Sequence, residues 1–257
     1  MYLDRQLIEN AAFRLRNAKR AVAFTGAGIS VDSGIPPFRG EDGVWAKYDP
    51  SFLELDTFLR APAESWMVIK EIFYDAFDKA EPNSAHRMLA KLEQEGYITG
   101  VITQNIDHLH QAAGNEHVIE FHGNNQFLTC LQCKHRVKVK PGIFDPFPPR
   151  CSECGSILKP EFVFYGEDIP QRAFDAAYEQ TRFADVWLVI GTTGEVMPAC
   201  SMPIEAKRNR AKIIEINTQP SQFTDTITDI FLQGKASDVL EALYKVLHGP
   251  MFSGDHH

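Results

Sequence analysis

The sequence predicts an α/β protein in which a doubly wound, mainly parallel sheet of the Rossmann type carries a smaller lobe formed by two insertions. Three observations lead to this prediction. Four short apolar runs, rich in β-branched residues, each end at a glycine or a polar turn, as buried parallel strands do. Segments with helical spacing lie between and around these runs, so that strand and helix alternate. Two long stretches interrupt the alternation.

The four apolar runs are the expected strands of the sheet: AVAFTG (21–26), GVITQN (100–105), WLVIGTT (187–193) and KIIEIN (212–217). Helical spacing predicts one helix with Ile8, Ala11, Ala12 and Leu15 on its inner face, and another with Ala85, Met88, Leu89 and Leu92, ending at Gly96. A last helix is expected to begin at Ser237 as N-cap and to end at Gly249-Pro250, with Val239, Leu240, Leu243, Val246 and Leu247 facing inward.

The two interruptions divide the chain into a predicted large domain and two insertions. The first insertion, 36–83, is rich in aromatic residues and is expected to form a loop and a helical part. The second, 127–160, contains four paired cysteines. The remaining segments, 1–35, 84–126 and 161–257, are assigned to the Rossmann-like domain.

Length and charge narrow the functional class. A chain of 257 residues with 44% hydrophobic content suits one large domain and a smaller lobe. The formal charge of −8 repels the phosphates of nucleic acids and anionic membranes, so neither is an expected partner. No apolar run reaches the roughly 18 residues of a membrane span, and the N-terminus lacks the apolar core of a signal peptide. We therefore expect a cytoplasmic protein and leave its oligomeric state open.

The loop from Gly26 to Gly40, GAGISVDSGIPPFRG, follows the first predicted strand. In a doubly wound sheet this position faces a phosphate-bearing ligand, and Gly26 and Gly28 would let backbone amides approach a pyrophosphate. Val31 stands where the dinucleotide fingerprint requires a third glycine, which disfavours an ordinary dehydrogenase. The pattern favours a cofactor-covering loop, with a flexible surface turn as the alternative.

Cys130-Leu-Gln-Cys133 and Cys151-Ser-Glu-Cys154 form two Cys-x-x-Cys pairs separated by seventeen residues. This spacing is typical of two hairpin knuckles whose four thiolates bind one tetrahedral zinc ion. Four protein ligands leave no open position for water, so the predicted zinc is structural and 127–160 is a predicted zinc ribbon. Free or disulfide-bonded cysteines are the alternative, and Cys200 is interpreted as a small buried residue.

Two polar clusters, Thr103-Gln-Asn-Ile-Asp107 and Glu120-Phe-His-Gly123, follow apolar runs. The carboxyl ends of parallel strands line the ligand crevice, so Asn105 and Asp107 are candidates to reach a bound cofactor. His122 is a candidate base near neutral pH. Each residue also has a structural explanation, because Asn and Asp cap helices and a lone histidine is often structural.

Together these motifs resemble one family, the sirtuins, which are NAD-dependent protein deacylases, and the resemblance covers most of the chain. Two positions depart from the commonest pattern, since Thr193 replaces a usual serine and Gly194-Glu195 replaces a more apolar pair. Glu195 puts a charge beside the expected peptide cleft. In chain order the resemblance rests on Gly26-Ala-Gly-Ile-Ser30, the run Gly34 to Gly40, Thr103 to Asp107, His122-Gly123, both Cys-x-x-Cys pairs, the run ending at Glu167, Gly191-Thr-Thr193 and Ile216-Asn217.

The resemblance implies that NAD is consumed as a co-substrate. Asn105 and Asp107 would bind its carboxamide, Gln104 would hold the nicotinamide ribose, and His122 would act as general base toward a ribose hydroxyl. The products would be nicotinamide, free lysine and O-acyl-ADP-ribose. The implied NAD-binding residues are Gly26, Ala27, Gly28, Ser30, Phe38, Arg39, Gln104, Asn105, Ile106, Asp107, Gly191, Thr192, Thr193, Asn217, Lys235 and Ala236.

The resemblance also implies acyl-lysine proteins or peptides as partners. Acetyl is the implied acyl group, with longer apolar groups as further candidates. Two alternatives stay open: a mono-ADP-ribosyltransferase that uses the same site, and an inactive zinc-ribbon binding protein. The peptide would add as a strand between Val163, Phe164, Tyr165, Gly166 and Glu167 on one side and Val196 on the other.

Acyl selectivity can also be anticipated from the resemblance. Relatives that remove succinyl or malonyl groups carry a Tyr-x-x-Arg pair beside the acyl pocket, where the guanidinium pairs with the distal carboxylate. The matching segment of this chain, Trp66 to Tyr74, contains no arginine. One alignment places Ile69 and Ile72 at the two positions, and another places Tyr74 and Phe77 there, so poor activity on succinyl-lysine is expected.

Overall fold

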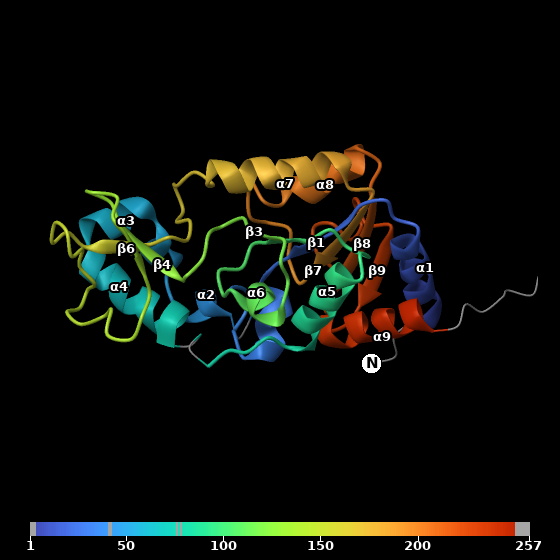
Figure 1. The fold of residues 1–257 in the computed structure, drawn as a ribbon, viewed down its shortest axis with the longest axis horizontal. Coiled ribbons are helices and arrows are strands. Elements are labelled where there is room, and N and C mark those ends of the chain that lie inside the picture. Colours follow the sequence, from blue (N-terminus) through green and yellow to red (C-terminus); the bar gives the residue numbers. More distant parts are fainter. Residues whose placement is uncertain (1–3, 41–42, 76, 78, 250–257) are drawn as a thin grey trace, which may run out of the picture.

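The computed structural model describes residues 4–40, 43–75, 77 and 79–249, and its largest element is a six-stranded sheet. Figure 1 shows this sheet and its helices in one part of an elongated molecule, with a smaller lobe at the other end. The strand order is β3-β2-β1-β7-β8-β9, and every pairing is parallel. The strands are β1 (Ala21–Thr25), β2 (Val101–Thr103), β3 (Val118–Glu120), β7 (Val186–Ile190), β8 (Lys212–Asn217) and β9 (Ile230–Gln233).

This topology confirms the predicted doubly wound sheet. The chain builds outward from β1 to β3 in one direction and then returns to place β7 on the other side of β1, so the order reverses between β1 and β7. In such sheets ligands bind beyond the carboxyl ends of the strands at this reversal. The four predicted strands are β1, β2, β7 and β8, whereas the two short edge strands, β3 and β9, were missed.

Alternating side chains of the central strands pack on the two faces of the sheet. In β1, Ala21 and Ala23 join a core with α1 (Arg5–Arg16), α5 (Ser84–Gln94) and α9 (Ala236–His248). Val22 and Phe24 point to the opposite face and join a core with α7 (Gln171–Phe183) and α8 (Ser201–Arg208). Figure 1 shows these two helical layers on either side of the sheet. Burial on both faces explains why the strands are almost wholly apolar.

Helices α1, α5 and α9 confirm the three helices that the spacing predicted. The predicted start of the last one was wrong, because Lys235 occupies the N-cap of α9 and Ala236 is already helical. The hydroxyl of Ser237 donates a hydrogen bond to the carboxylate of Asp32 instead of capping the helix. The helix ends at His248 with Gly249 as C-cap, and the predicted Pro250 lies outside the described residues.

The smaller lobe combines a three-stranded antiparallel sheet with short helices. Its strand order is β5-β4-β6, with β4 (Phe127–Cys130), β5 (Arg136–Lys138) and β6 (Leu158–Pro160). The fully buried Trp66 donates its indole N–H to the carbonyl of Leu158 at 2.7 Å, which ties α4 to β6. The helical part comprises α2 (Val44–Lys47), η2 (Pro50–Leu53), α3 (Leu55–Arg60), α4 (Pro62–Lys70) and the π-helical turn η3 (Glu71–Asp75).

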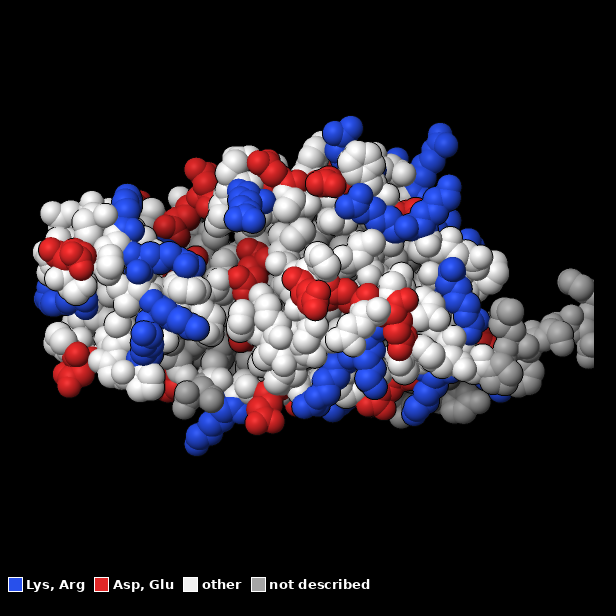
Figure 2. All heavy atoms as spheres, in the orientation of Figure 1, with Lys and Arg blue, Asp and Glu red and all other residues white. Residues whose placement is uncertain are grey.

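Charged side chains of both signs lie beside one another on the face shown in Figure 2. This mixture occurs in a chain whose formal charge is −8. No one sign of charge therefore dominates that face. Among the described residues, none of the helices combines the length and the apolar character that crossing a bilayer requires.

Candidate active site

A cavity of about 670 Å³ lies at the carboxyl ends of β1, β2, β7 and β8, where the strand order reverses, and extends to the smaller lobe. Its volume falls in the range of ligand-binding clefts. It is lined by fourteen of the sixteen residues predicted to bind NAD; the other two, Ser30 and Asp107, line a smaller recess beside it. All six residues predicted to bind the peptide also line the cavity.

The glycines after β1 allow two loops to touch through their backbones. A Cβ on Gly28 would lie 2.7 Å from the Cα of Gly191, and one on Gly26 would lie 2.8 Å from the carbonyl oxygen of Gly191. The amide of Gly26 donates to the carbonyl of Ile190 at 2.9 Å, and that of Gly28 donates to Gly191 at 2.8 Å. The amides of Gly26 and Gly28 are therefore used within the fold, and the two glycines allow the close approach of η1 (Ala27–Ser33) to the end of β7.

His122 is the second residue after the end of β3 and lines the cavity. Its Nδ1 lies 3.1 Å from the backbone carbonyl of Gln104, which directly follows β2. A carbonyl only accepts, so Nδ1 carries the proton and Nε2 keeps its lone pair. Burial lowers the pKa of His122, and the hydrogen bond to Gln104 opposes that shift. The cavity thus contains a neutral imidazole whose Nε2 can accept a proton.

Ser30 joins Asn105 and Asp107 in one hydrogen-bonded group. Asn105 Nδ2 donates to Ser30 Oγ at 3.1 Å and to the carbonyl of Gly26 at 3.2 Å. Ser30 Oγ donates to Asp107 Oδ2 at 2.7 Å, and Asp107 Oδ1 accepts the amide of Leu109 at 3.0 Å. Burial raises the pKa of Asp107, while these two hydrogen bonds oppose the shift. Since Nδ2 of Asn105 is engaged, its Oδ1 is the atom left to accept from a ligand.

The recess that contains Ser30 and Asp107 is covered by aromatic side chains. Phe38 lines both the recess and the cavity, and its ring lies 5.3 Å from that of Trp45 and 6.2 Å from that of Phe73, centroid to centroid. The predicted covering loop therefore places an apolar ring between the polar group and the smaller lobe. Such a cover reduces the access of water to whatever the recess binds.

Two ion pairs border the other half of the cavity. Arg39 Nε lies 2.9 Å from Glu195 Oε2, and Lys235 Nζ lies 3.1 Å from an oxygen of Asp32. Arg39, Lys235 and Asp32 line the cavity. Thr193 Oγ1 also donates to Glu195 Oε2 at 3.3 Å, so the threonine and the glutamate that depart from the family pattern contact each other.

The segment predicted to pair with a peptide is already paired along part of one edge. The amide of Tyr165 donates to the carbonyl of Leu53 at 2.8 Å, and its carbonyl accepts the amide of Leu55 at 3.0 Å. In the part of the chain that the structure describes, the amide of Gly166 and the carbonyl of Val163 have no hydrogen-bond partner. Any substrate strand would therefore pair with these groups rather than with Tyr165.

Phe73 is the residue of the helical insertion that reaches the cavity from the predicted acyl-pocket segment. The residues named in the two alignments do not line the cavity: Ile69 and Tyr74 pack in the lobe core, and Ile72 and Phe77 line only the recess. The π-helical turn η3 begins directly after α4 and changes which side chains face the cavity. Phe73 shares this apolar end with Trp45, Leu53 and Phe162.

Several cavity residues were missed by the sequence analysis. Asp32 and Phe73 occupy positions that only the folded loops bring to the cavity. The segment 218–220 also lines it, directly after β8. Its position after a predicted strand was the one available signal.

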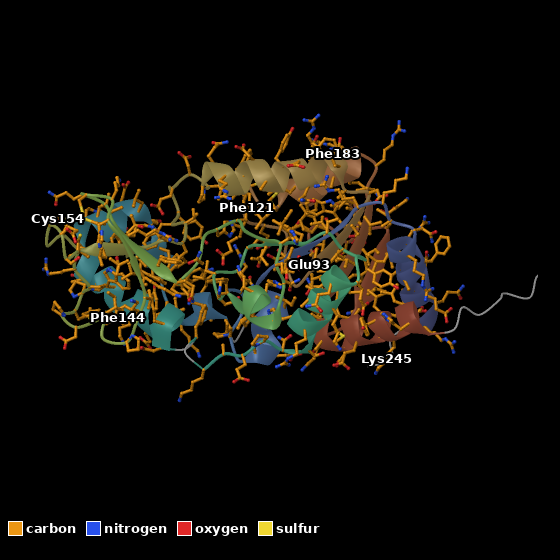
Figure 3. All side chains as sticks on the ribbon, in the orientation of Figure 1. Glu93, Phe121, Phe144, Cys154, Phe183 and Lys245 are labelled. Carbon is orange, nitrogen blue, oxygen red and sulfur yellow. The ribbon has the colours of Figure 1, made fainter. Side chains whose placement is uncertain are left out.

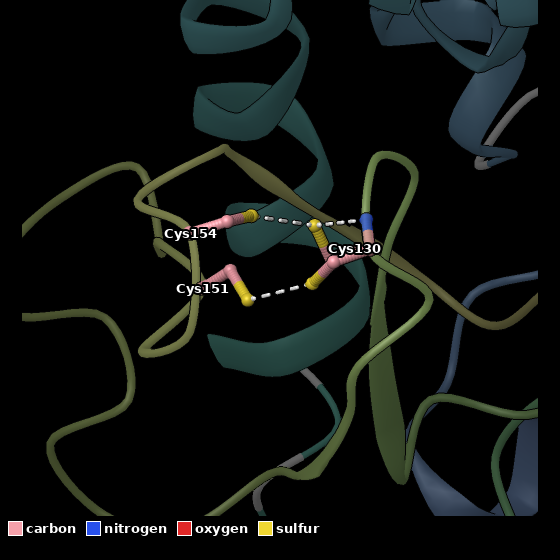
Figure 4. Close-up of side chains that lie close together, drawn as sticks. Cys130, Cys151 and Cys154 are labelled. Carbon is pink, nitrogen blue, oxygen red and sulfur yellow. Dashed lines mark hydrogen bonds between the residues drawn. The ribbon is translucent and has the colours of Figure 1, made fainter.

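Cys130, Cys133, Cys151 and Cys154 come together, with all four sulfur atoms within 4.8 Å of one another. Cys130 Sγ lies 3.4 Å from Cys154 Sγ, and Cys133 Sγ lies 3.5 Å from Cys151 Sγ (Figure 4). These separations are too long for disulfides, and all four cysteines are free thiols. Zinc–sulfur bonds of about 2.3 Å in a tetrahedron place sulfur atoms roughly 3.8 Å apart. The cluster therefore fits one zinc ion.

The cysteine cluster lies apart from the cavity. Figure 3 places Cys154 at the outer end of the smaller lobe, and none of the four cysteines lines the cavity or the recess. Phe121, which precedes His122, is labelled beside α7 in the same view and belongs to the core between the large sheet and α7 and α8. A metal held by four thiolates at this distance is consistent with a structural zinc.

The chain resembles proteins of known class across most of its length. The model of the Sir2 family matches residues 26–198. NAD-dependent protein deacylase 2 of Pyrobaculum aerophilum is 42% identical over 238 residues, covering 91% of this chain and 93% of that protein. The NAD-dependent protein deacylase of Thermococcus kodakarensis is 40% identical over 258 residues, covering 98% of this chain and all of that protein, 100%.

Solved Sir2 structures share the fold. One, from work on the mechanism and regulation of Sir2 enzymes, superimposes with a TM-score of 0.87 and 42% identity, covering 95% of this chain and 98% of that one. Another, a Sir2 complex with a p53 peptide and NAD+, gives a TM-score of 0.86 at 33% identity, covering 93% and 97%. A third holds a deacetylated p53 peptide and 3'-O-acetyl ADP ribose, with a TM-score of 0.88 at 34% identity, covering 93% and 97%.

Proposed function

The chain belongs to the Sir2 family, and on that basis we propose that it removes acetyl groups from lysine side chains of proteins while consuming NAD. The products are nicotinamide, free lysine and O-acetyl-ADP-ribose. The single observation that carries this proposal is His122, a neutral base whose Nδ1–H is fixed by Gln104 and whose Nε2 is free beside the cavity. The matched relatives are NAD-dependent protein deacylases and deacetylases.

Each part of the cavity has a role in this reaction. The recess with Asn105 and Asp107 would take the nicotinamide carboxamide, which needs both an acceptor and a donor. Asn105 Oδ1 would accept its N–H. Asp107 would donate to the carboxamide oxygen only in its protonated form. The acetyl carbonyl oxygen would displace nicotinamide from its ribose carbon. His122 Nε2 would then take a proton from a ribose hydroxyl, whose oxygen attacks the acyl carbon, and addition of water would release the lysine amine and O-acetyl-ADP-ribose. Phe38 would keep water from the ribose.

The rest of the NAD-binding set would hold the nucleotide. Gln104 Nε2 donates to Thr192 Oγ1 at 3.1 Å, and Asn217 Nδ2 donates to the carbonyl of Thr192 at 3.0 Å. These contacts support a fixed polar surface at the ends of β2, β7 and β8 for the two riboses. Arg39 and Lys235 are the cations that line the cavity and would face the diphosphate.

The function is tested by incubating the protein with NAD and an acetyl-lysine peptide and identifying the products by mass spectrometry. Free O-acetyl-ADP-ribose and deacetylated peptide are expected. ADP-ribose attached to a protein side chain would instead support the mono-ADP-ribosyltransferase alternative. The absence of nicotinamide release would support an inactive zinc-ribbon binding protein.

Glu195→Gln is expected to lower the KM for NAD by up to about fivefold. Arg39 must exchange Glu195 for the diphosphate, and half-exposed ion pairs of this kind are worth up to about 1 kcal/mol. The measurement is steady-state kinetics at saturating peptide. Glu205→Gln is the matched control, since Glu205 pairs with Arg208 on α8 and does not line the cavity. A higher KM for NAD in Glu195→Gln would contradict this exchange of Glu195 for the diphosphate at Arg39.

Succinyl-lysine peptides are expected to have a kcat/KM at least tenfold below that of the acetyl version. The end of the cavity around Phe73 is apolar, and the two lining cations, Arg39 and Lys235, are already ion-paired. An unpaired carboxylate buried there would cost several kcal/mol. The same peptide sequence carrying acetyl, butyryl and succinyl groups provides the comparison. Equal rates on acetyl and succinyl peptides would mean that a cation does reach the acyl group.

The cellular setting forms a further part of the proposal. We propose a cytoplasmic location, because free thiols that bind metal persist in a reducing compartment. The negative formal charge supports the expectation of no direct nucleic-acid partner. The division into domains at 36–83 and 127–160 is likewise a proposal, supported by the aromatic core that both insertions share.

A further inference from the structure

Lys159 is a buried lysine on β6, in the sheet whose strand β4 carries Cys130 of the cysteine cluster. Its side chain is 5% exposed. Its Nζ donates to the carbonyl of Pro160 at 2.9 Å and to that of Phe162 at 3.0 Å, and it lies 2.8 Å from Glu167 Oε2. The ammonium also lies 3.9 Å from the centroid of the Phe164 ring. Every one of these partners lies within eight residues of Lys159, on the segment that leaves β6.

Glu167 closes a loop around this ammonium. The same oxygen that pairs with Lys159 also accepts the amide of Phe164 at 2.7 Å. The amide of Glu167 donates to the carbonyl of Phe164 at 3.0 Å. The turn from Phe164 to Glu167 is therefore held by its own backbone and by a carboxylate that Lys159 neutralises.

The segment held in this way is the wall of the cavity that would pair with a peptide. Phe162 to Glu167 line the cavity, and Gly166 and Val163 supply the unpaired backbone groups of the described segment. Gly166 has a φ of +88°, so its amide direction depends on the turn being held in place. Without the ammonium, the carbonyls of Pro160 and Phe162 would lose a partner and Glu167 would carry a poorly compensated charge.

We infer that Lys159 is a positioning residue for the acyl-lysine peptide, fixing the segment Val163 to Glu167 from behind without touching the substrate. The inference rests on the proposed deacylase function and adds a residue outside the predicted site. It also provides a physical link from the cysteine cluster to the substrate, because Cys130 on β4 is the register partner of Leu158, the neighbour of Lys159.

Stability alone is a weak reason for this arrangement. A buried ion pair often contributes little to stability compared with apolar residues of similar volume, whereas removing one partner is costly. The core around Lys159 is aromatic and apolar and could accommodate such residues. The hydrogen bonds and the ion pair of Lys159 all go to the segment that forms one wall of the cavity. A role in holding the conformation of that segment therefore explains the lysine better than stability does.

The test compares the wild type with Lys159→Met by steady-state kinetics, NAD binding and fluorescence anisotropy of a labelled acetyl-lysine peptide. The expected result is a rise in the KM and Kd for peptide of roughly tenfold or more, the scale of one or two lost hydrogen bonds. The Kd for NAD should stay within about twofold, and zinc content should be unchanged. Arg136→Met is the control, since it breaks an ion pair with Glu161 in the same sheet while leaving the Lys159 contacts in place.

Three outcomes would overturn the inference. One is an unchanged peptide Kd in folded Lys159→Met, and another is an equal rise in the Kd for peptide and for NAD. If Lys159→Met does not fold, the double variant Lys159→Met with Glu167→Met removes the unpaired charge. Recovery of both folding and peptide affinity in the double variant would also overturn the inference. Peptide binding weaker in the double variant than in Glu167→Met alone supports it. Peptide binding is measured without turnover, so an inactive wild type would contradict the proposed function and not this inference.

Discussion

His122→Ala is expected to abolish deacylation while the protein still folds and binds NAD. A positioned general base contributes about 10²–10⁴-fold to a rate, so kcat should fall by at least the lower figure. His122 contacts the chain through Nδ1 to Gln104 and through its backbone carbonyl, which accepts the amide of Val163 at 2.9 Å. The substitution keeps the second contact, so folding should persist. The measurements are single-turnover kinetics and the Kd for NAD.

His117→Ala is the matched control for this variant, because His117 is exposed and pairs with Glu93 away from the cavity. It should retain wild-type activity. Activity near wild type in His122→Ala would contradict the assignment of the base. A loss of NAD binding equal to the loss of rate would instead indicate that His122 is structural.

The pH profile of the wild type should carry the signature of His122. Burial lowers its pKa below the usual imidazole value of 6.5, so the reactive neutral form is already dominant at neutral pH. The rate should therefore be level near pH 7 and above, and should fall only as acid protonates Nε2. A rate that still climbs steeply between about pH 7 and 8 would contradict a depressed pKa.

The sequence predicted the parts of the site that depend on local pattern. Polar residues directly after apolar runs, such as Asn105, Asp107 and His122, lie where parallel strands end, so their convergence follows from the topology alone. The spacing of the cysteines likewise predicted their cluster. Each of these patterns is a short stretch of sequence, and the fold class alone is enough to predict where in the structure it lies.

What the sequence could not predict depends on contacts between distant segments. The amides of Gly26 and Gly28 bind backbone carbonyls near residue 190, and nothing in the loop itself indicates that use. Arg39 and Glu195 lie far apart in the chain and meet across the cavity. The choice of Phe73 over Ile69 depends on a π-helical turn, which has no simple periodic signal.

The zinc site carries the other large expected effect: Cys130→Ala or Cys151→Ala should lower zinc content and stability together. Zinc binding by four-ligand modules is worth roughly 10–16 kcal/mol, as much as the whole net stability of a typical domain. The smaller lobe should lose its fold. Because β4 carries Cys130 and its neighbour β6 carries Lys159, the segment Val163 to Glu167 should then also lose the conformation that binds the peptide. Activity would then be lost because the substrate-binding segment is unfolded, and not because a group that takes part in the reaction has been removed.

Elemental analysis and thermal unfolding of the same samples measure both effects of these substitutions. The wild type should contain one zinc ion per chain, since four thiolates complete a single tetrahedral shell. Cys200→Ala is the control, because Cys200 is buried outside the cluster, at the N-cap of α8, and should keep full zinc. Strong chelators should reproduce the instability of Cys130→Ala in the wild type, because metal binding and folding of the lobe are coupled. A Cys130→Ala protein that retains both its zinc and its melting temperature would contradict a four-thiolate site.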